Sequence, residues 1–92
     1  MKFRLHGVDT PERGWRAKCE NEKKLEEVAR KFLIGWIERG KKYHVDILGF
    51  DKYGGRYLVN FRIDEEDVAS KLIEMGFAKP YFGKGGKPDW CV

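Results

Sequence analysis

The sequence predicts an α+β fold with one long helix, one short helix and several short strands. Three observations carry this prediction. Apolar residues recur at helical spacing over residues 21–39, and they do so again over residues 68–75. Apolar side chains also alternate with other residues, as they do in half-buried strands, over residues 3–6, 43–48 and 56–63.

The first predicted strand lies at the start of the chain. Phe3 and Leu5 alternate with Arg4 and His6, so the strand has one apolar face, and Gly7 ends it. On this pattern alone, Arg4 is a solvent-facing strand residue.

The long helix is predicted from Asn21 to Arg39. Its apolar residues form a single stripe that we expect to face the core: Leu25, Val28, Ala29, Phe32, Leu33, Trp36 and Ile37. Gly40 follows the last of them, at the position where a left-handed C-terminal cap is common.

A hairpin and the short helix are predicted downstream. Residues 43–48 and 56–63 flank the segment GFDKYGG, whose glycines are typical of a hairpin loop. We expect Asp64 and Asp67 to form the N-cap and the acidic first turn of the short helix. Its apolar face consists of Val68, Ala69, Leu72, Ile73 and Met75.

The composition limits the function. The chain of 92 residues has 19 Lys and Arg against 15 Asp and Glu, a net charge of +4 that favours an anionic partner. We treat residues 1–92 as one domain, because we find neither a linker nor a repeat in them. The sequence has no membrane-spanning apolar run and no signal peptide, which predicts no membrane association and a cytoplasmic location by default.

Several segments carry a resemblance to a known family. FRLHGVDTPE, DKYGGR and IEMGFAKPYF are similar, in this order, to the thermonuclease (staphylococcal nuclease-like) family over nearly the whole chain. The resemblance implies a partial oligonucleotide/oligosaccharide-binding (OB-fold-like) barrel and calcium-dependent hydrolysis of DNA and RNA. RAKCENEKKLEEVA and WC resemble a bacterial branch of the family, and this branch suggests export.

The chemistry of phosphodiester hydrolysis explains the residue types in these segments. The enzyme must neutralise the phosphate, stabilise the charge that develops and hold a water in line for attack. By resemblance, Arg4 and Arg56 match the two phosphate-binding arginines, and Glu12 matches the general base. Asp9 and the main-chain carbonyl of Thr10 match the metal ligands.

The resemblance also implies contacts to the substrate, by Leu5, Lys52, Tyr53, Leu58 and Tyr81. It assigns Lys52 and Tyr53 to the terminal phosphate and the sugar of the nucleotide, whereas the residues alone predict an ordinary hairpin loop. Tyr81 could stack on a base or close the core over the short helix, and both interpretations stay open here.

One motif of the family is missing from this sequence. Members normally carry two further strands before the first strand of this chain, with an Asp-Gly-Asp-Thr motif that supplies a second calcium-binding aspartate. The implied Ca²⁺ would therefore bind weakly unless another segment or chain completes the site. A partner chain, strand exchange within a homo-oligomer, an upstream start codon and loss of catalysis all remain open.

Two functions follow from these observations. The first is a metal-dependent nuclease acting on DNA or RNA. The alternative is a catalytically inactive OB-fold module that binds nucleic acid or takes part in an assembly.

The chain has two cysteines, Cys19 and Cys91. They would be ordinary thiols in a reducing cytosol. In an exported protein they would form a bridge that closes a long loop and stabilises the fold by ~4 kcal/mol.

Overall fold

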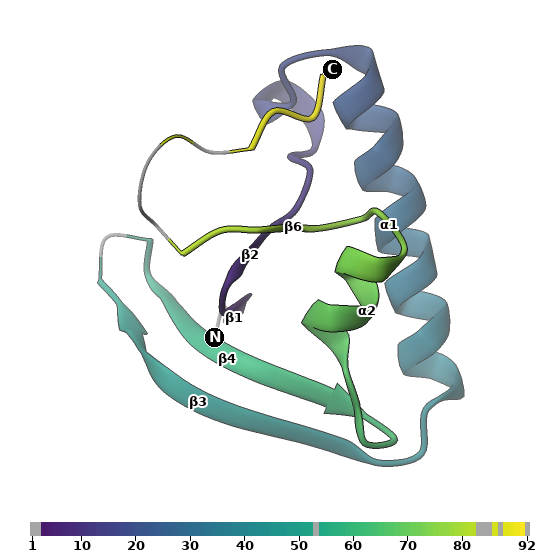
Figure 1. Ribbon diagram of the computed structural model, residues 1–92, viewed down its shortest axis with the longest axis vertical. Coiled ribbons are helices and arrows are strands. Elements are labelled where there is room, and N and C mark those ends of the chain that lie inside the picture. The colour runs from purple at the N-terminus through teal and green to yellow at the C-terminus, as the bar shows by residue number, and fades with distance from the viewer. Residues whose placement is uncertain (1–2, 53, 83–85, 87, 92) are drawn as a thin grey trace.

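The computed structural model describes residues 3–52, 54–82, 86 and 88–91, and it has the α+β architecture that the sequence predicts (Figure 1). Its elements in chain order are β1 (Phe3–Leu5), β2 (Val8–Asp9), the 3₁₀ helix η1 (Gly14–Arg16), α1 (Glu20–Arg39), β3 (Tyr43–Asp51), β4 (Arg56–Ile63), β5 (Glu66–Asp67), α2 (Val68–Glu74) and β6 (Lys79–Pro80).

The main sheet has the strand order β1-β4-β3, with β5 also paired to β4. β1 runs parallel to β4, whereas β3 and β4 form an antiparallel hairpin. β2 and β6 make a separate antiparallel pair that joins the two ends of the chain. The sheet does not close in the part of the chain that is described, so the fold is a partial barrel, with β3 as the outermost strand in Figure 1.

The long helix α1 begins one residue earlier than predicted, with Cys19 as its N-cap. The prediction of a left-handed cap at Gly40 is wrong, because its φ is −70°. Glycine is needed there for a different reason: a Cβ would lie 2.6 Å from Cγ2 of Ile63. Within the described residues, neither helix has the length and apolar character of a membrane span.

The prediction for the short helix is right about Asp67 and wrong about Asp64. Asp67 is the N-cap of α2, and its carboxylate accepts a hydrogen bond of 2.9 Å from the amide of Ser70. Asp64 belongs to the turn after β4, where its φ is +50°. Its carboxylate accepts from the amides of Lys41 and Lys42 instead, and so ties this turn to the start of β3.

The hairpin is longer than predicted. β3 continues through Phe50 to Asp51, and its pairing with β4 shifts by one residue between Ile47 and Gly49. Leu48 is therefore the extra residue of a β-bulge, which ends the strict alternation on which the prediction relied.

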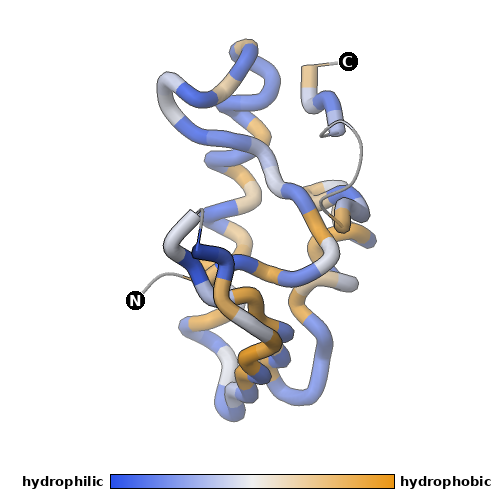
Figure 2. The backbone as a smooth tube through the Cα atoms, turned by 90° about the vertical axis from the view of Figure 1, so that its left-hand side faces the viewer, coloured by the Kyte–Doolittle hydropathy of each residue, from blue (hydrophilic) through white to orange (hydrophobic). Residues whose placement is uncertain are grey.

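The core lies between the sheet and the two helices. Its buried residues are Val8, Ile63, Val68, Leu72 and Ala78, and half-buried side chains of α1, including Phe32 and Trp36, pack against them. In Figure 2 the hydrophobic colour continues along the lower part of the tube, where β3 and β4 lie. Part of the predicted apolar surface is not covered, because Val28, Ile37, Ile73 and Met75 are exposed.

Candidate active site

A cavity of about 250 Å³ brings the predicted catalytic and metal-binding residues together. Arg4, Asp9, Thr10, Glu12 and Arg56 all line it, although they are spread over the first 56 residues of the chain. Leu5 also lines this cavity, with Phe3, Val8, Leu33 and Leu72.

The parallel pairing of β1 with β4 places the two arginines near each other. Arg4 lies opposite Leu58 in the register of these strands. Arg56 comes two residues before Leu58 on β4, and residues two apart in a strand share a face. Arg56 is the first residue of β4 and lies opposite Asp51 of β3.

The guanidinium of Arg56 is only partly satisfied. Its Nε is buried, and among the described residues no hydrogen-bond acceptor contacts it. Gly54 makes room beside it, since a Cβ at that position would lie 3.1 Å from this Nε and 2.9 Å from Oδ2 of Asp51. A buried donor without an acceptor is costly, so this atom is suited to an anionic ligand that brings one.

Arg4 lies between two cavities. Its Nη2 makes a long contact of 3.5 Å with the carbonyl of Val8, and its Cζ lies 5.9 Å from the centre of the Tyr81 ring. Besides the first cavity, it lines a neighbouring one of about 290 Å³ with Leu58, Tyr81 and Asp51. The resemblance-implied residues Leu58 and Tyr81 are thus adjacent to Arg4.

Asp9 is one of the few buried polar residues, with 7% of its surface exposed. Its Oδ2 accepts a hydrogen bond of 3.0 Å from the indole Nε1 of Trp90, which is itself buried. Sequence reasoning missed this contact, because 81 residues separate Asp9 from Trp90. The one signal in the sequence is the next residue, Cys91, whose disulfide with Cys19 brings the C-terminal segment back to the start of α1.

Glu22 is a second residue that sequence reasoning missed. It is only 3% exposed, although it lies in the first turn of α1. Its Oε2 accepts 2.9 Å from the amide of Glu12, and its Oε1 accepts 2.8 Å from the amide of Lys18. Glu22 lies three residues after the N-cap Cys19, where a capping-box glutamate would accept from the amide of the N-cap residue. Its carboxylate instead accepts from the loop before α1, which carries Glu12.

The family assignment agrees with this geometry. The profile of the family described as Staphylococcal nuclease homologue matches residues 2–89. The chain belongs to the staphylococcal nuclease family. A comparison with curated proteins found no match.

The remaining substrate-contact predictions for this staphylococcal nuclease homologue concern the hairpin loop. Lys52 is exposed there, between β3 and β4. Tyr53 lies outside the described residues.

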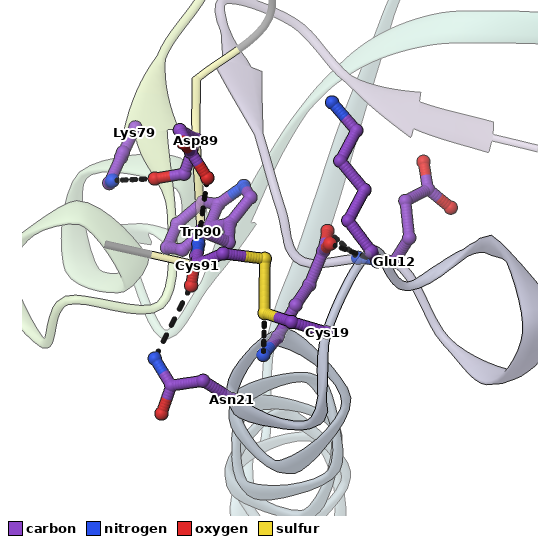
Figure 3. Close-up of a disulfide and its surroundings, with 9 residues drawn as sticks. Glu12, Cys19, Asn21, Lys79, Asp89, Trp90 and Cys91 are labelled. Atoms are coloured by element: carbon purple, nitrogen blue, oxygen red, sulfur yellow. Dashed lines mark hydrogen bonds between the residues drawn. A yellow bond between two sulfur atoms is a disulfide. The ribbon is translucent and has the colours of Figure 1, made fainter.

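The sulfur atoms of Cys19 and Cys91 are bonded in the structure, with their Cα atoms 6.0 Å apart (Figure 3). The bond fixes the C-terminal segment to the start of α1, where Nδ2 of Asn21 donates 3.3 Å to the carbonyl of Trp90. Lys79 donates 2.8 Å to the carbonyl of Asp89, and its Nζ lies 4.6 Å from the centre of the Trp90 ring. Of the two states left open by the sequence, the structure has the bridged one.

The calcium expected for this family meets an incomplete set of ligands here. No group of three or more His, Cys, Asp or Glu side chains in the described part of the chain could hold a metal ion. Asp9 and the carbonyl of Thr10 are hard oxygen donors beside the same cavity, so they fit Ca²⁺ in kind. They do not fit it in number, since Ca²⁺ takes six to eight oxygens.

Proposed function

We propose that this staphylococcal nuclease homologue hydrolyses phosphodiester bonds of DNA or RNA as a metal-dependent nuclease. The observation that carries the proposal is the buried, unsatisfied Nε of Arg56 in a cavity that Arg4 and Glu12 also line. No acceptor among the described residues contacts this Nε, so it can donate to an anionic ligand. The net charge of +4 also favours the approach of an anion to the protein.

The two arginines neutralise the phosphate and stabilise the transition state. A guanidinium presents parallel N–H donors to two phosphate oxygens and stays charged at any physiological pH. Arg4 and Arg56 line the same cavity, so both guanidinium groups can donate to a phosphate bound there. Such donors are worth most where charge develops during the reaction.

Glu12 is the general base in this proposal. It takes the proton from the water that attacks phosphorus, which requires its carboxylate to stay within hydrogen-bonding reach of that water. The buried carboxylate of Glu22 fixes the main chain at Glu12 and thereby positions this base.

Asp9 and the carbonyl of Thr10 would hold the metal. A calcium ion held there would supply positive charge beside the phosphate and would lower the pKa of a bound water. Because the described residues offer few ligands, we expect this chain to need a high calcium concentration.

The neighbouring cavity is suited to the nucleoside next to the scissile phosphate. Tyr81 is half-buried there beside Leu58, so its ring offers an apolar surface on which a base can stack. Lys52, and Tyr53 by resemblance, would contact the terminal phosphate and the sugar. The disulfide favours an oxidising compartment as the place of action, because such bonds are rare in the cytosol.

The second candidate function is binding of nucleic acid without catalysis. The incomplete set of metal ligands in the described chain favours it, since a phosphate can bind two arginines without a metal ion. In that case Arg4 and Arg56 bind the backbone, while Glu12 has no chemical role.

The experiment that separates the two functions measures cleavage of labelled single-stranded DNA and of RNA in millimolar calcium. We expect cleavage that chelator abolishes and that readdition of calcium restores. Binding in calcium without cleavage, by a fully folded protein, would contradict the nuclease and favour the binding module.

A further inference from the structure

The loop that precedes α1 presents a tryptophan to solvent. Trp15 is 88% exposed, the highest value among the large apolar side chains that the structure describes. It belongs to the short helix η1 and follows Gly14, whose φ of +61° is a left-handed conformation that glycine adopts readily. Tryptophan is buried over most of its surface in the average protein, so a ring exposed to this degree is available to a ligand.

Positive charge surrounds this ring. Residues 13–18, which we call the Trp15 loop, have the sequence RGWRAK, with three cationic side chains and no acidic one. Cζ of Arg16 lies over the ring of Trp15, 5.3 Å from its centre. No described carboxylate forms an ion pair with Arg13, Arg16 or Lys18. An aromatic ring among cations is the combination with which proteins bind single-stranded nucleic acid.

A third cavity, of about 640 Å³, joins the Trp15 loop to the candidate active site. Trp15 and Arg16 line it, and so do Thr10 and Glu12. Thr10 and Glu12 also line the cavity of Arg56. A strand whose phosphate is bound at Arg56 can therefore continue past Glu12 to the exposed ring.

The Arg56 cavity lies between its two neighbours. The cavity of Tyr81 shares Arg4 with the Arg56 cavity, whereas the cavity of Trp15 shares Glu12 with it. The Tyr81 and Trp15 cavities have no lining residue in common. One aromatic side chain is thus available on each side of the arginines.

Two acidic side chains also line the Trp15 cavity, and neither belongs to the Trp15 loop. The carboxylate of Glu26 forms an ion pair of 3.3 Å with Arg30, which offsets its charge. Glu12 is the residue shared with the Arg56 cavity. The charge closest to Trp15 along the chain is therefore positive.

The Trp15 loop is held at both ends by one buried carboxylate. Glu22 accepts 2.9 Å from the amide of Glu12 through Oε2 and 2.8 Å from the amide of Lys18 through Oε1 (Figure 3). The next residue, Cys19, forms the disulfide with the C-terminal segment. These contacts keep the two ends of the loop beside the residue proposed as the general base.

We propose that the Trp15 loop is a binding subsite for a nucleotide of single-stranded DNA or RNA, across the scissile phosphate from Tyr81. The base stacks on the indole ring of Trp15, and Arg13 and Arg16 contact the phosphates next to it. This inference rests on the proposed function in one respect, that the protein binds nucleic acid, and it does not require catalysis.

The affinity for a single-stranded oligonucleotide of about eight nucleotides, measured in chelator so that the strand stays intact, tests the subsite. We expect Trp15→Ala to lower this affinity roughly ten- to a hundred-fold, which is the scale of one base stacked on an aromatic side chain. Trp15→Tyr keeps an aromatic ring and should restore most of the affinity. Circular dichroism of each variant checks that the fold is unchanged.

An abasic strand of the same length is the matched control ligand. It carries the same phosphates without bases, so we expect wild-type protein and Trp15→Ala to bind it equally. A dinucleotide, which is long enough only for the Arg56 and Tyr81 cavities, should also bind equally to both proteins.

The outcomes separate this subsite from the proposed function. Wild-type protein and Trp15→Ala with the same affinity for the intact strand would overturn the subsite and leave the proposed function in place. A loss of affinity for the abasic strand as large as that for the intact strand would overturn base stacking on Trp15. Wild-type protein that binds none of these ligands would overturn both the subsite and the proposed function.

Discussion

The indole nitrogen of Trp90 donates a hydrogen bond of 3.0 Å to the carboxylate of Asp9, and both side chains are buried. The C-terminal segment, held by the bond between Cys91 and Cys19, thus contributes directly to the candidate active site. The cavity of the candidate active site, which Arg4, Asp9 and Glu12 line, is therefore supported by both ends of the chain.

Replacing Trp90 with Phe tests this contact. Phenylalanine keeps an aromatic ring, although a smaller one, but the buried carboxylate of Asp9 loses its donor, and an unsatisfied buried acceptor costs about 1–3 kcal/mol. We expect the midpoint of urea unfolding to fall accordingly. Trp15→Phe is the control, since Trp15 is 88% exposed and should leave the midpoint unchanged. Equal midpoints for the two variants would show that the hydrogen bond does not stabilise the fold.

The disulfide should be a major source of stability. Its cysteines are 72 residues apart, and closing a loop of this length constrains the unfolded chain by about 4 kcal/mol in the chain-entropy model. We expect reduced protein, and the double variant Cys19→Ser/Cys91→Ser, to unfold at clearly lower urea concentrations. An unfolding curve that reduction leaves unchanged would contradict this role of the disulfide.

Glu22 should affect catalysis through the position of Glu12. The amides of Glu12 and Lys18 donate to different oxygens of the Glu22 carboxylate, and glutamine replaces one of these oxygens with an NH2 group, which donates and cannot accept from either amide. We expect Glu22→Gln to lower kcat roughly ten- to a hundred-fold, because small displacements of a catalytic group are costly, while the affinity for DNA changes little.

The control for this prediction is Glu27→Gln, which removes the same charge from the exposed face of α1 and breaks a surface pair with Lys31. It should leave both kcat and binding unchanged. A Glu22→Gln enzyme with wild-type kcat would exclude a positioning role for Glu22.

Much of the fold could be predicted because it follows from local patterns. The stripe of α1 and the alternation of β1, β3 and β4 are properties of neighbouring residues, and the structure has these elements close to the predicted bounds. The strands β2, β5 and β6 have two residues each, too few for a pattern to show. They form only because the tertiary fold brings their partners together.

The details that sequence reasoning missed depend on contacts between distant segments. Gly40 is expected as a cap, yet its role is to leave space for Ile63. Asp64 resembles a helix cap, yet its acceptors are used by the amides of Lys41 and Lys42. For the site, the family motifs point to the residues that line the cavity. Trp90 and Glu22, which form hydrogen bonds with Asp9 and with the main chain of Glu12, belong to no local motif.

Binding of single-stranded DNA should depend on salt through the arginines. Each phosphate contact contributes about −0.7 to the slope of log affinity against log salt concentration on single strands. Arg56→Gln should therefore reduce the magnitude of the slope by about this amount. Arg39→Gln, at the far end of α1, removes the same charge and should leave the slope unchanged. Equal salt slopes for Arg56→Gln and Arg39→Gln would mean that the bound strand does not contact Arg56.

The most direct measurement is the rate of DNA cleavage by Glu12→Gln in millimolar calcium, compared with wild type and with Glu74→Gln. Both variants exchange a carboxylate for an amide, but Glu74 is exposed on α2, whereas Glu12 lines the cavity with Arg4 and Arg56. A lost general base predicts a fall of roughly 10²–10⁴-fold for Glu12→Gln and no change for Glu74→Gln, with DNA affinity retained by both. Wild-type protein that cleaves no faster than Glu12→Gln would contradict the active site described for this chain.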